Sequence, residues 1–116
     1  MSETEKDHIA LLAILEAIEK IQKISAPIKS PEKLEADFIA FDACLMNFIV
    51  IGEMVLRLSD TLMGKYKEVE WYKIKGFRNM VAHDYFGIDA EKVWDIIQTK
   101  LPELKAKANQ IIQETR

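Results

Sequence analysis

Residues 38–63, FIAFDACLMNFIVIGEMVLRLSDTLM, form the stretch that decides the fold of this 116-residue chain. Positions four and three apart define one face of an α-helix: Phe38, Phe41, Leu45, Phe48, Gly52, Val55 and Ser59. Residues 48–51, Phe-Ile-Val-Ile, point in every direction around such a helix. We therefore predict a long helix reaching about Met63. It either lies at the centre of a bundle or uses part of its surface for an intermolecular contact.

The segment before this stretch is also predicted to be helical. A first helix over residues 4–25 has one apolar stripe and ends at Ala26-Pro27; the stripe residues are Leu11, Ile14, Leu15, Ile18, Ile21 and Ile24. Ser30 followed by Pro31 is typical of a helix start. A short helical piece to about Ala36 then leads into the long helix, either continuous with it or separated by a kink.

Beyond a polar connector at 64–70, two or three further helices are predicted. The helix over 71–83 turns four residues inward, which are Trp71, Ile74, Phe77 and Val81. Asp89 is a candidate N-cap for the next helix, and Pro102 kinks that helix or restarts it as a fifth. The sequence thus predicts an all-α up-and-down bundle of four or five helices, with residues 1–116 forming a single domain.

Composition and charge narrow the functional classes. The formal net charge of −3 argues against a protein that binds nucleic acid by overall charge. Any RNA contact would be local, and the basic residues between 65 and 78 are the candidates: Lys65, Lys67, Lys73, Lys75 and Arg78. The alternative is a solvated positive face.

The remaining sequence features suggest a cytoplasmic protein. The single Cys44 lies in an apolar run, where we expect a buried, reduced thiol. The polar start of the chain does not resemble a signal peptide, and no uninterrupted apolar run reaches the roughly 18 residues of a membrane span. Two histidines and one cysteine give no metal-ligand spacing. His8 is expected to be exposed near a fraying helix end.

Residues 76–87, GFRNMVAHDYFG, concentrate the polar chemistry of the chain. In a helix over 71–83, Asn79 and His83 lie one turn apart on the same face. Arg78 lies about 140° away from His83 around the helix, but its long side chain can curl back toward the imidazole. Gly87 is a natural stop for this segment.

These groups suit phosphate chemistry without a metal ion or cofactor. An unperturbed histidine has a pKa of about 6.5 and exchanges protons at neutral pH, and a guanidinium matches two phosphate oxygens. Together they would cleave RNA by attack of the adjacent 2′-hydroxyl and leave a 2′,3′-cyclic phosphate. One histidine acts as base or acid, so two facing copies would be more complete. Alternatively, His83 caps the helix end and Arg78 and Asn79 make structural contacts.

Gly52 and Glu53 are expected to connect the long helix to this motif. A glycine inside a helix costs about 1 kcal/mol relative to alanine, which suggests close approach of another backbone. Gly76 is the candidate partner. Glu53 would be expensive to bury alone, so we expect it either to orient Arg78 or His83 or to face solvent.

The spacing Arg78-x4-His83-x-Tyr85 resembles the motif of the HepT-like toxins, a branch of the HEPN superfamily of small helical ribonucleases. Similar blocks surround it in the same order: Ile51-Gly52-Glu53, Trp71, His83 to Gly87, Val93-Trp94 and Leu101 to Leu104. The resemblance implies a homodimeric ribonuclease toxin of a toxin–antitoxin pair, with catalytic Arg78 and His83 in a cleft at the two-fold axis. Asn79 and Glu53 would support them, and Lys73 and Lys75 would contact RNA.

The resemblance also implies a role for Tyr85 and a partner for the chain. In the family, the antitoxin is a minimal nucleotidyltransferase that transfers AMP to the tyrosine of the motif. A main alternative is a non-catalytic partner or substrate-binding subunit of such a nucleotidyltransferase, with the same bundle. A third interpretation is a helical interaction domain with a chance motif. We expect no metal and no membrane partner.

Overall fold

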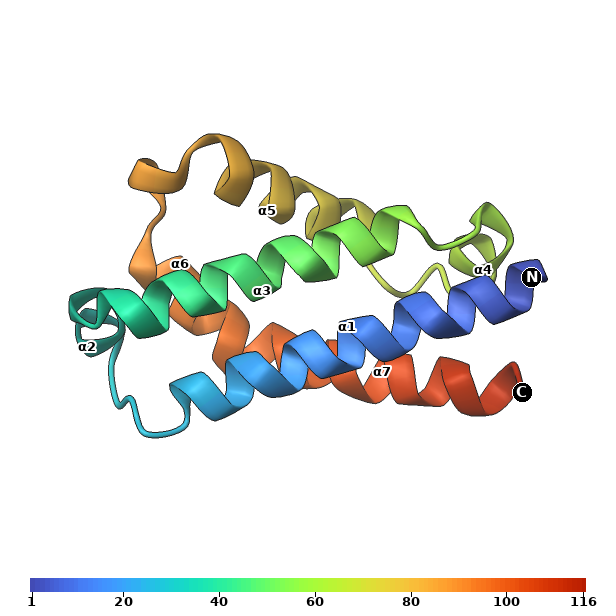
Figure 1. The fold of residues 1–116 in the computed structure, drawn as a ribbon, viewed down its shortest axis with the longest axis horizontal. Helices are drawn as coiled ribbons and strands as arrows, with labels where there is room; N and C mark the ends of the chain where they lie inside the picture. The colour runs from blue at the N-terminus through green and yellow to red at the C-terminus, as the bar shows by residue number, and fades with distance from the viewer.

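Four long helices and three short ones follow one another along the chain, without any strand (Figure 1). The computed structural model describes residues 1–116. The helices are α1 (Glu3–Ser25), α2 (Pro31–Ala36), α3 (Phe38–Leu56), α4 (Asp60–Lys65), α5 (Trp71–His83), α6 (Ala90–Asp95) and α7 (Leu101–Glu114). A 3₁₀ turn, η1 (Tyr85–Gly87), follows α5, and a π-helical segment, η2 (Ile96–Lys100), joins α6 to α7. The prediction of an all-α bundle is confirmed.

Helix α3 occupies the centre of the bundle. It packs against α1 on one side and α5 on the other, while α7 packs on α1 (Figure 1). Its buried residues are Cys44, Leu45, Phe48, Ile51, Gly52 and Val55, which join the buried stripe of α1 in one core. Because apolar residues lie on all sides of α3, this helix packs against α1 and α5 at the same time. The helix that bears the motif, α5, is therefore positioned chiefly by α3.

The long helix ends at Leu56, earlier than the sequence predicts. Ser59 caps α4 by accepting a hydrogen bond from the Leu62 amide at 3.1 Å. The amide and hydroxyl of Ser59 donate to the two carboxylate oxygens of Asp7 at 2.8 and 2.6 Å. Asp7 is buried in α1, so this tertiary contact stabilises a break that the apolar pattern does not reveal. Gly64 accordingly lies inside α4, and the connector begins at Tyr66.

Two other breaks follow the sequence more closely. Asp37 separates α2 from α3 and caps α3 by accepting from the Ala40 amide, which is the predicted kink. Asp89 caps α6 as predicted. Near Pro102 the helix continues: the π-helical segment precedes the proline, and the Leu101 amide donates to the Ile96 carbonyl. This wider turn accommodates a residue that has no amide hydrogen to donate.

Length and composition alone would let α3 cross a membrane. Its 19 residues have a mean hydropathy of 1.9, and 33% of that window is buried inside the bundle. The expectation based on uninterrupted apolar runs missed this property, because Asp42 and Glu53 interrupt the run without lowering the average enough. The central helix of a folded bundle passes the same test.

The two termini lie at the same end of the bundle (Figure 1). The His8 ring lies 2.7 Å from the Thr115 hydroxyl, and His8 is partly buried. The prediction of an exposed His8 near a fraying end is therefore wrong, because α7 packs along α1 and covers it. Cys44 is buried as predicted, and burial raises the pKa of its thiol to about 11.

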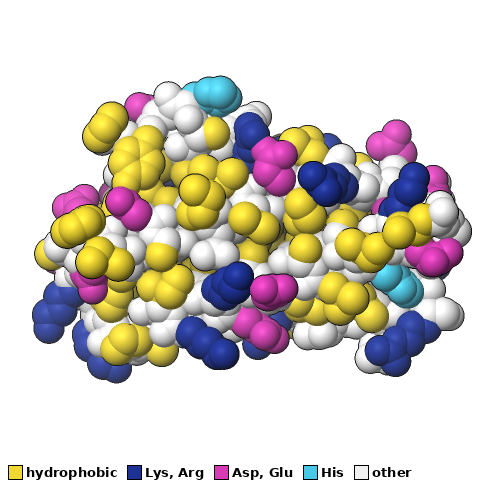
Figure 2. Space-filling model, in the orientation of Figure 1, with side chains coloured by type: hydrophobic (Ala, Val, Ile, Leu, Met, Phe, Trp, Pro, Cys, Tyr) yellow, Lys and Arg dark blue, Asp and Glu magenta, His cyan; other side chains and the backbone are white.

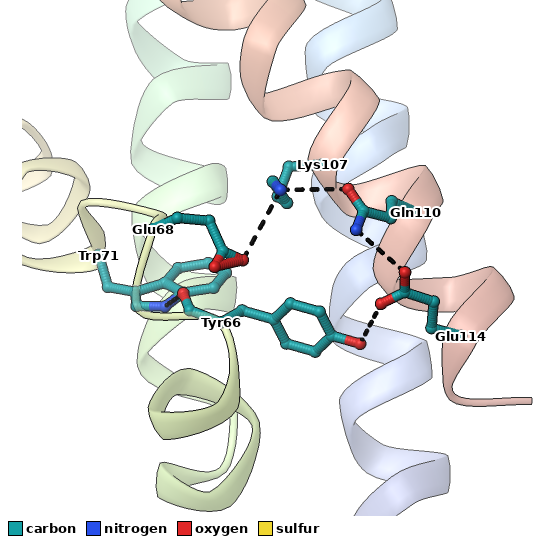
Figure 3. A network of polar contacts seen from close by, with 6 residues as sticks. All are labelled: Tyr66, Glu68, Trp71, Lys107, Gln110 and Glu114. Carbon is teal, nitrogen blue, oxygen red and sulfur yellow. Dashed lines mark hydrogen bonds and ion pairs between the residues drawn. The ribbon is translucent and has the colours of Figure 1, made fainter.

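A chain of polar contacts joins the connector between α4 and α5 to α7 (Figure 3). The Tyr66 hydroxyl donates to Glu114 at 2.8 Å, and Gln110 donates to the other oxygen of Glu114 at 3.0 Å. Lys107 reaches both Gln110 and Glu68. The Trp71 indole, at the start of α5, donates to the Tyr66 carbonyl at 3.1 Å. The beginning of the motif helix is thus anchored to α7 through Tyr66.

This network predicts a pH-dependent contribution to stability. Hydrogen bonds from Gln110 and Tyr66 lower the pKa of Glu114. A lowered folded-state pKa stabilises the fold above the ordinary glutamate pKa of about 4.3 and loses that effect as the pH falls through the lowered value. We expect Tyr66→Phe to lower the Tm by about 2–4 °C at pH 7 and the difference to shrink below pH 4. Calorimetry at several pH values checks this, and an equal difference at every pH would contradict it.

Candidate functional site

The close packing of α5 on α3 depends on Gly52. A Cβ atom added to Gly52 would lie 2.2 Å from the Cβ and 2.4 Å from the Cγ of Arg78. The prediction of close approach at Gly52 is therefore confirmed, but its partner is the stem of Arg78. Gly76, the predicted partner, has no atom within 4 Å of such a Cβ. Gly76 is exposed because it lies on a different face of α5.

Two acceptors hold the guanidinium of Arg78. It forms an ion pair with Glu53 of α3 and donates to the Asn79 side-chain oxygen at 3.0 Å. Only 23% of the Arg78 side chain is exposed, and its buried Nε has no partner. Glu53 therefore makes the polar contact with the motif that its proposed role requires. Arg78 makes no hydrogen bond to His83, because its guanidinium bonds to Glu53 and Asn79.

His83 is the last residue of α5 and is exposed to solvent. Its ring makes no hydrogen bond, so both ring nitrogens are available to a ligand. The amide of Asp84 donates to the Met80 carbonyl at 2.8 Å and closes the helix. Gly87 lies beyond this end, inside η1, and a Cβ there would meet the Asp84 carboxylate at 2.6 Å. Gly87 thus permits a tight turn but is not the stop that the sequence predicts.

Tyr85 begins η1 and contacts α3. Its hydroxyl donates to Asp42, and 41% of the residue remains exposed. The hydrogen bond to Asp42, together with desolvation and the charge of this carboxylate, raises the pKa of Tyr85. The neighbouring Phe86 is 99% exposed and packs edge-on against the Tyr85 ring at 5.3 Å. Tyr85 is therefore held by its oxygen yet open to solvent.

Asp42 is the residue of this site that the sequence analysis missed. It lies eleven positions before Glu53, a spacing of about three turns that places both carboxylates on one face of α3, about 16 Å apart. Glu53 binds Arg78 near one end of the motif, and Asp42 binds Tyr85 at the other. The signal was available in principle, because two carboxylates share a face of an otherwise apolar helix. The partners of these two carboxylates could not be predicted from the sequence, because pairing depends on how α5 crosses α3.

The other basic candidates make no hydrogen bond or ion pair with Arg78, His83 or Tyr85. Lys73 forms an ion pair with Glu70 at 2.8 Å and lines a cavity of about 750 Å³ between α5 and α7. Phe48, Phe77 and Leu104 are among the other lining residues, whereas Arg78 and His83 do not contribute to it. Lys75 lies one turn before Arg78 and makes no ion pair. No cluster of three or more histidine, cysteine or acidic side chains that could hold a metal ion occurs.

The family described as "Ribonuclease HepT-like" matches residues 14–111 of the chain, which include α3, α5 and the whole motif. The chain belongs to the HepT-like ribonuclease family. A match over so much of the chain makes a chance occurrence of the motif untenable and supports a ribonuclease. The resemblance stated from the motif is confirmed.

Curated HepT-like relatives carry names that agree with this assignment. A protein of Caldanaerobacter subterraneus subsp. tengcongensis, described as a candidate RNase, is 29% identical over 85% of this chain and 84% of its own length. A "Probable ribonuclease HepT" of Thermococcus cleftensis is 27% identical over 92% of this chain and 94% of its own length. A Methanocaldococcus jannaschii protein, described as gamma-glutamylcyclotransferase and candidate RNase, matches over 91% of this chain but 47% of its own length. No solved structure matches significantly.

Proposed function

We propose that this HepT-like protein is a metal-independent ribonuclease toxin whose Arg78 and His83 cleave RNA in a cleft between two protomers. The observation that carries the proposal is the state of these two side chains. Arg78 is fixed against Gly52 by Glu53 and Asn79, while the His83 ring is exposed without a partner. A fixed cation and a free proton acceptor five residues apart on one helix suit a reaction at a phosphodiester.

In the proposed reaction, His83 takes the proton of the 2′-hydroxyl as its oxygen attacks the adjacent phosphorus. The bond from phosphorus to the 5′-oxygen of the next nucleotide breaks, which leaves a 2′,3′-cyclic phosphate and a 5′-hydroxyl. The guanidinium of Arg78 stabilises the charge that develops on the phosphoryl oxygens. His83 of a second copy supplies the proton to the departing 5′-oxygen, so the base and the acid come from different protomers.

The exposed face of α3 supports a homodimer at this site. Ile39 and Met46 lie one turn on either side of Asp42 and are 71% and 60% exposed. With Phe38 and Phe86 they form an apolar surface around the contact between Asp42 and Tyr85. Hydrophobic side chains gather over this part of the molecule (Figure 2). A symmetric contact through Ile39 and Met46 would bury these side chains and bring two motifs together, and AMP transfer then requires that Tyr85 stay at the open rim of the contact.

Charged substitutions on this surface should disrupt the dimer. We expect Met46→Asp and Ile39→Asp to convert the protein to a monomer in light scattering and to reduce RNA cleavage by at least tenfold, since a carboxylate buried without a partner is costly. Leu12→Asp is the matched control, because Leu12 is 57% exposed on α1, away from the motif. Dimers that persist in both α3 variants would contradict this use of the surface.

We also propose that a minimal nucleotidyltransferase antitoxin silences the protein by transferring AMP to Tyr85. The exposed fraction of Tyr85 supports this, because a buried phenol would be inaccessible to another enzyme. Each added AMP brings a negatively charged phosphodiester next to the residues that would bind RNA phosphates. The modified site would then repel its substrate. The proposed toxin, its antitoxin and RNA would meet in the cytoplasm.

Cleavage by a His83→Ala variant tests the ribonuclease proposal directly. Wild-type protein and the variant are incubated with total RNA and EDTA, and cyclic-phosphate ends are measured. We expect the variant to lose roughly 10²- to 10⁴-fold in rate, the range for removal of a general base. His8→Ala is the matched control, because that ring contacts Thr115 far from the motif in the sequence. Equal cleavage by wild type and His83→Ala would attribute the activity to a contaminant.

One observation favours the alternative of a non-catalytic partner of a nucleotidyltransferase. Glu53 and Asn79 occupy the Arg78 guanidinium, so phosphate must compete with a carboxylate for it. The same experiment separates the two functions. No cleavage by wild-type protein whose Tyr85 is shown by mass spectrometry to be unmodified would favour the partner subunit.

A further inference from the structure

The η1 turn is held on α3 by a single side-chain hydrogen bond. The Tyr85 hydroxyl donates to Asp42, and neither Phe86 nor Gly87 makes a side-chain hydrogen bond to the bundle. Phe86 is 99% exposed and adds almost no packing. The backbone contributes two bonds, from the Gly87 amide to the Asp84 carbonyl at 3.0 Å and from the Ile88 amide to the Tyr85 carbonyl at 3.5 Å. Apart from the partial burial of Tyr85, the contact of the turn with α3 therefore depends on the proton of Tyr85.

The proton on the Tyr85 oxygen decides whether that oxygen attracts or repels the Asp42 carboxylate. A phenol donates to a carboxylate, so the neutral hydroxyl is attracted to Asp42, and this interaction raises the pKa of Tyr85. A phosphodiester on the same oxygen has no proton to donate and carries a negative charge. Two anions at hydrogen-bonding distance repel each other, and no cation pairs with Asp42 to offset that repulsion.

We propose that Asp42 is a positioning residue for Tyr85, which holds the hydroxyl in place for nucleotidyl transfer and expels the η1 turn from α3 once the nucleotidyl group is attached. The inference rests on the proposed function, in which Tyr85 accepts AMP. It adds a second consequence of the modification: because only Asp84 separates η1 from His83, its release displaces the end of α5 as well as placing a group in the RNA site.

The transfer step balances with a nucleoside triphosphate as co-reactant. The Tyr85 oxygen forms a bond to the α-phosphorus, and the bond from that phosphorus to the oxygen bridging to the β-phosphate breaks, so pyrophosphate leaves. The phenolic proton passes to the Asp42 carboxylate and then to solvent. Asp42 thereby orients the nucleophile before the step and receives its proton during the step.

The first part of the experiment needs no second protein. The three tyrosines, labelled with ¹³C at the ζ carbon, are titrated by NMR in the wild type, Asp42→Asn and Asp42→Ala. We expect the Tyr85 pKa to fall in both variants, because a negative acceptor has been removed. Asp60→Asn, which removes the same charge from exposed α4, should leave the Tyr85 titration unchanged. An unchanged Tyr85 titration in Asp42→Ala would overturn the positioning role.

The second part uses ATP and the nucleotidyltransferase that modifies the wild type. We expect AMP transfer to Asp42→Ala to be at least about 10²-fold slower, with partial recovery in Asp42→Glu and no change in Asp60→Asn. The Gly87 and Ile88 amides should exchange hydrogen with solvent faster in fully modified wild-type protein than in unmodified wild-type protein. In modified Asp42→Asn they should stay slow, because a neutral amide does not repel the phosphodiester.

The outcomes separate this inference from the proposed function. Wild-type protein that takes no AMP overturns the proposed modification and the release that depends on it, whereas the titration still decides whether Asp42 positions the phenol. Efficient transfer to Asp42→Ala, or equal amide exchange in modified wild type and modified Asp42→Asn, overturns the inference while leaving Tyr85 as the acceptor.

Discussion

Gly52→Ala is expected to reduce RNA cleavage by about 10²-fold or more while removing only part of the stability. The new methyl group would lie 2.2 Å from the Cβ of Arg78, which is the near end of that side chain and cannot swing away independently of α5. Helix α5 must therefore move from α3. Overpacking of this kind costs roughly 1–3 kcal/mol, and about 1 kcal/mol returns because alanine favours the helix. Displacement of a catalytic group by an ångström has a far larger effect on rate than on folding.

Gly76→Ala provides the matched control on the motif helix itself. A Cβ at Gly76 meets nothing within 4 Å, so the variant should gain up to about 1 kcal/mol of stability and keep its cleavage rate. Chemical denaturation and the cyclic-phosphate assay measure both effects. If Gly52→Ala cleaves RNA as fast as Gly76→Ala, the seating of Arg78 on Gly52 is not needed for the reaction.

Arg78→Lys is expected to lower the cleavage rate by roughly 10²- to 10³-fold, which is the usual loss for one donor that stabilises a transition state. Lysine keeps the charge and can still reach Glu53, but it lacks the planar fork that binds Glu53 and Asn79 together and matches two phosphate oxygens. Because the ion pair survives, the Tm should change little. Single-turnover kinetics and thermal melting separate these two effects.

A double-mutant cycle with Glu53→Gln shows whether Glu53 acts through Arg78. Glutamine keeps a hydrogen-bond acceptor but removes the charge, so it should slow cleavage by wild-type Arg78 and have little further effect in Arg78→Lys. Independent, additive losses in the two variants would contradict a positioning role for Glu53. Asp60→Asn again serves as a control for loss of one surface charge.

The geometry of the site depends on two carboxylates of α3, Asp42 and Glu53, which both bind the segment formed by α5 and η1. Glu53 holds the guanidinium of Arg78, a residue of α5, and Asp42 holds the phenol of Tyr85, just beyond the end of α5. His83 lies between these two anchored residues in the sequence and remains free. Such an arrangement leaves the proposed proton-transferring side chain without a partner while its neighbours are held, which suits the proposed reaction with a second copy and RNA.

The amino-acid sequence by itself determined the helical class and the motif from Arg78 to Tyr85, because these depend on periodicity and spacing within short segments. Local signals also placed the caps at Ser30 and Asp89. Only the tertiary structure decided that Asp7 breaks the long helix at Ser59, that Gly52 receives Arg78 in place of Gly76, and that Asp42 binds Tyr85. Each of these contacts joins residues distant in sequence, and pairing across helices depends on crossing angle and register, which the periodicity of a single helix does not contain.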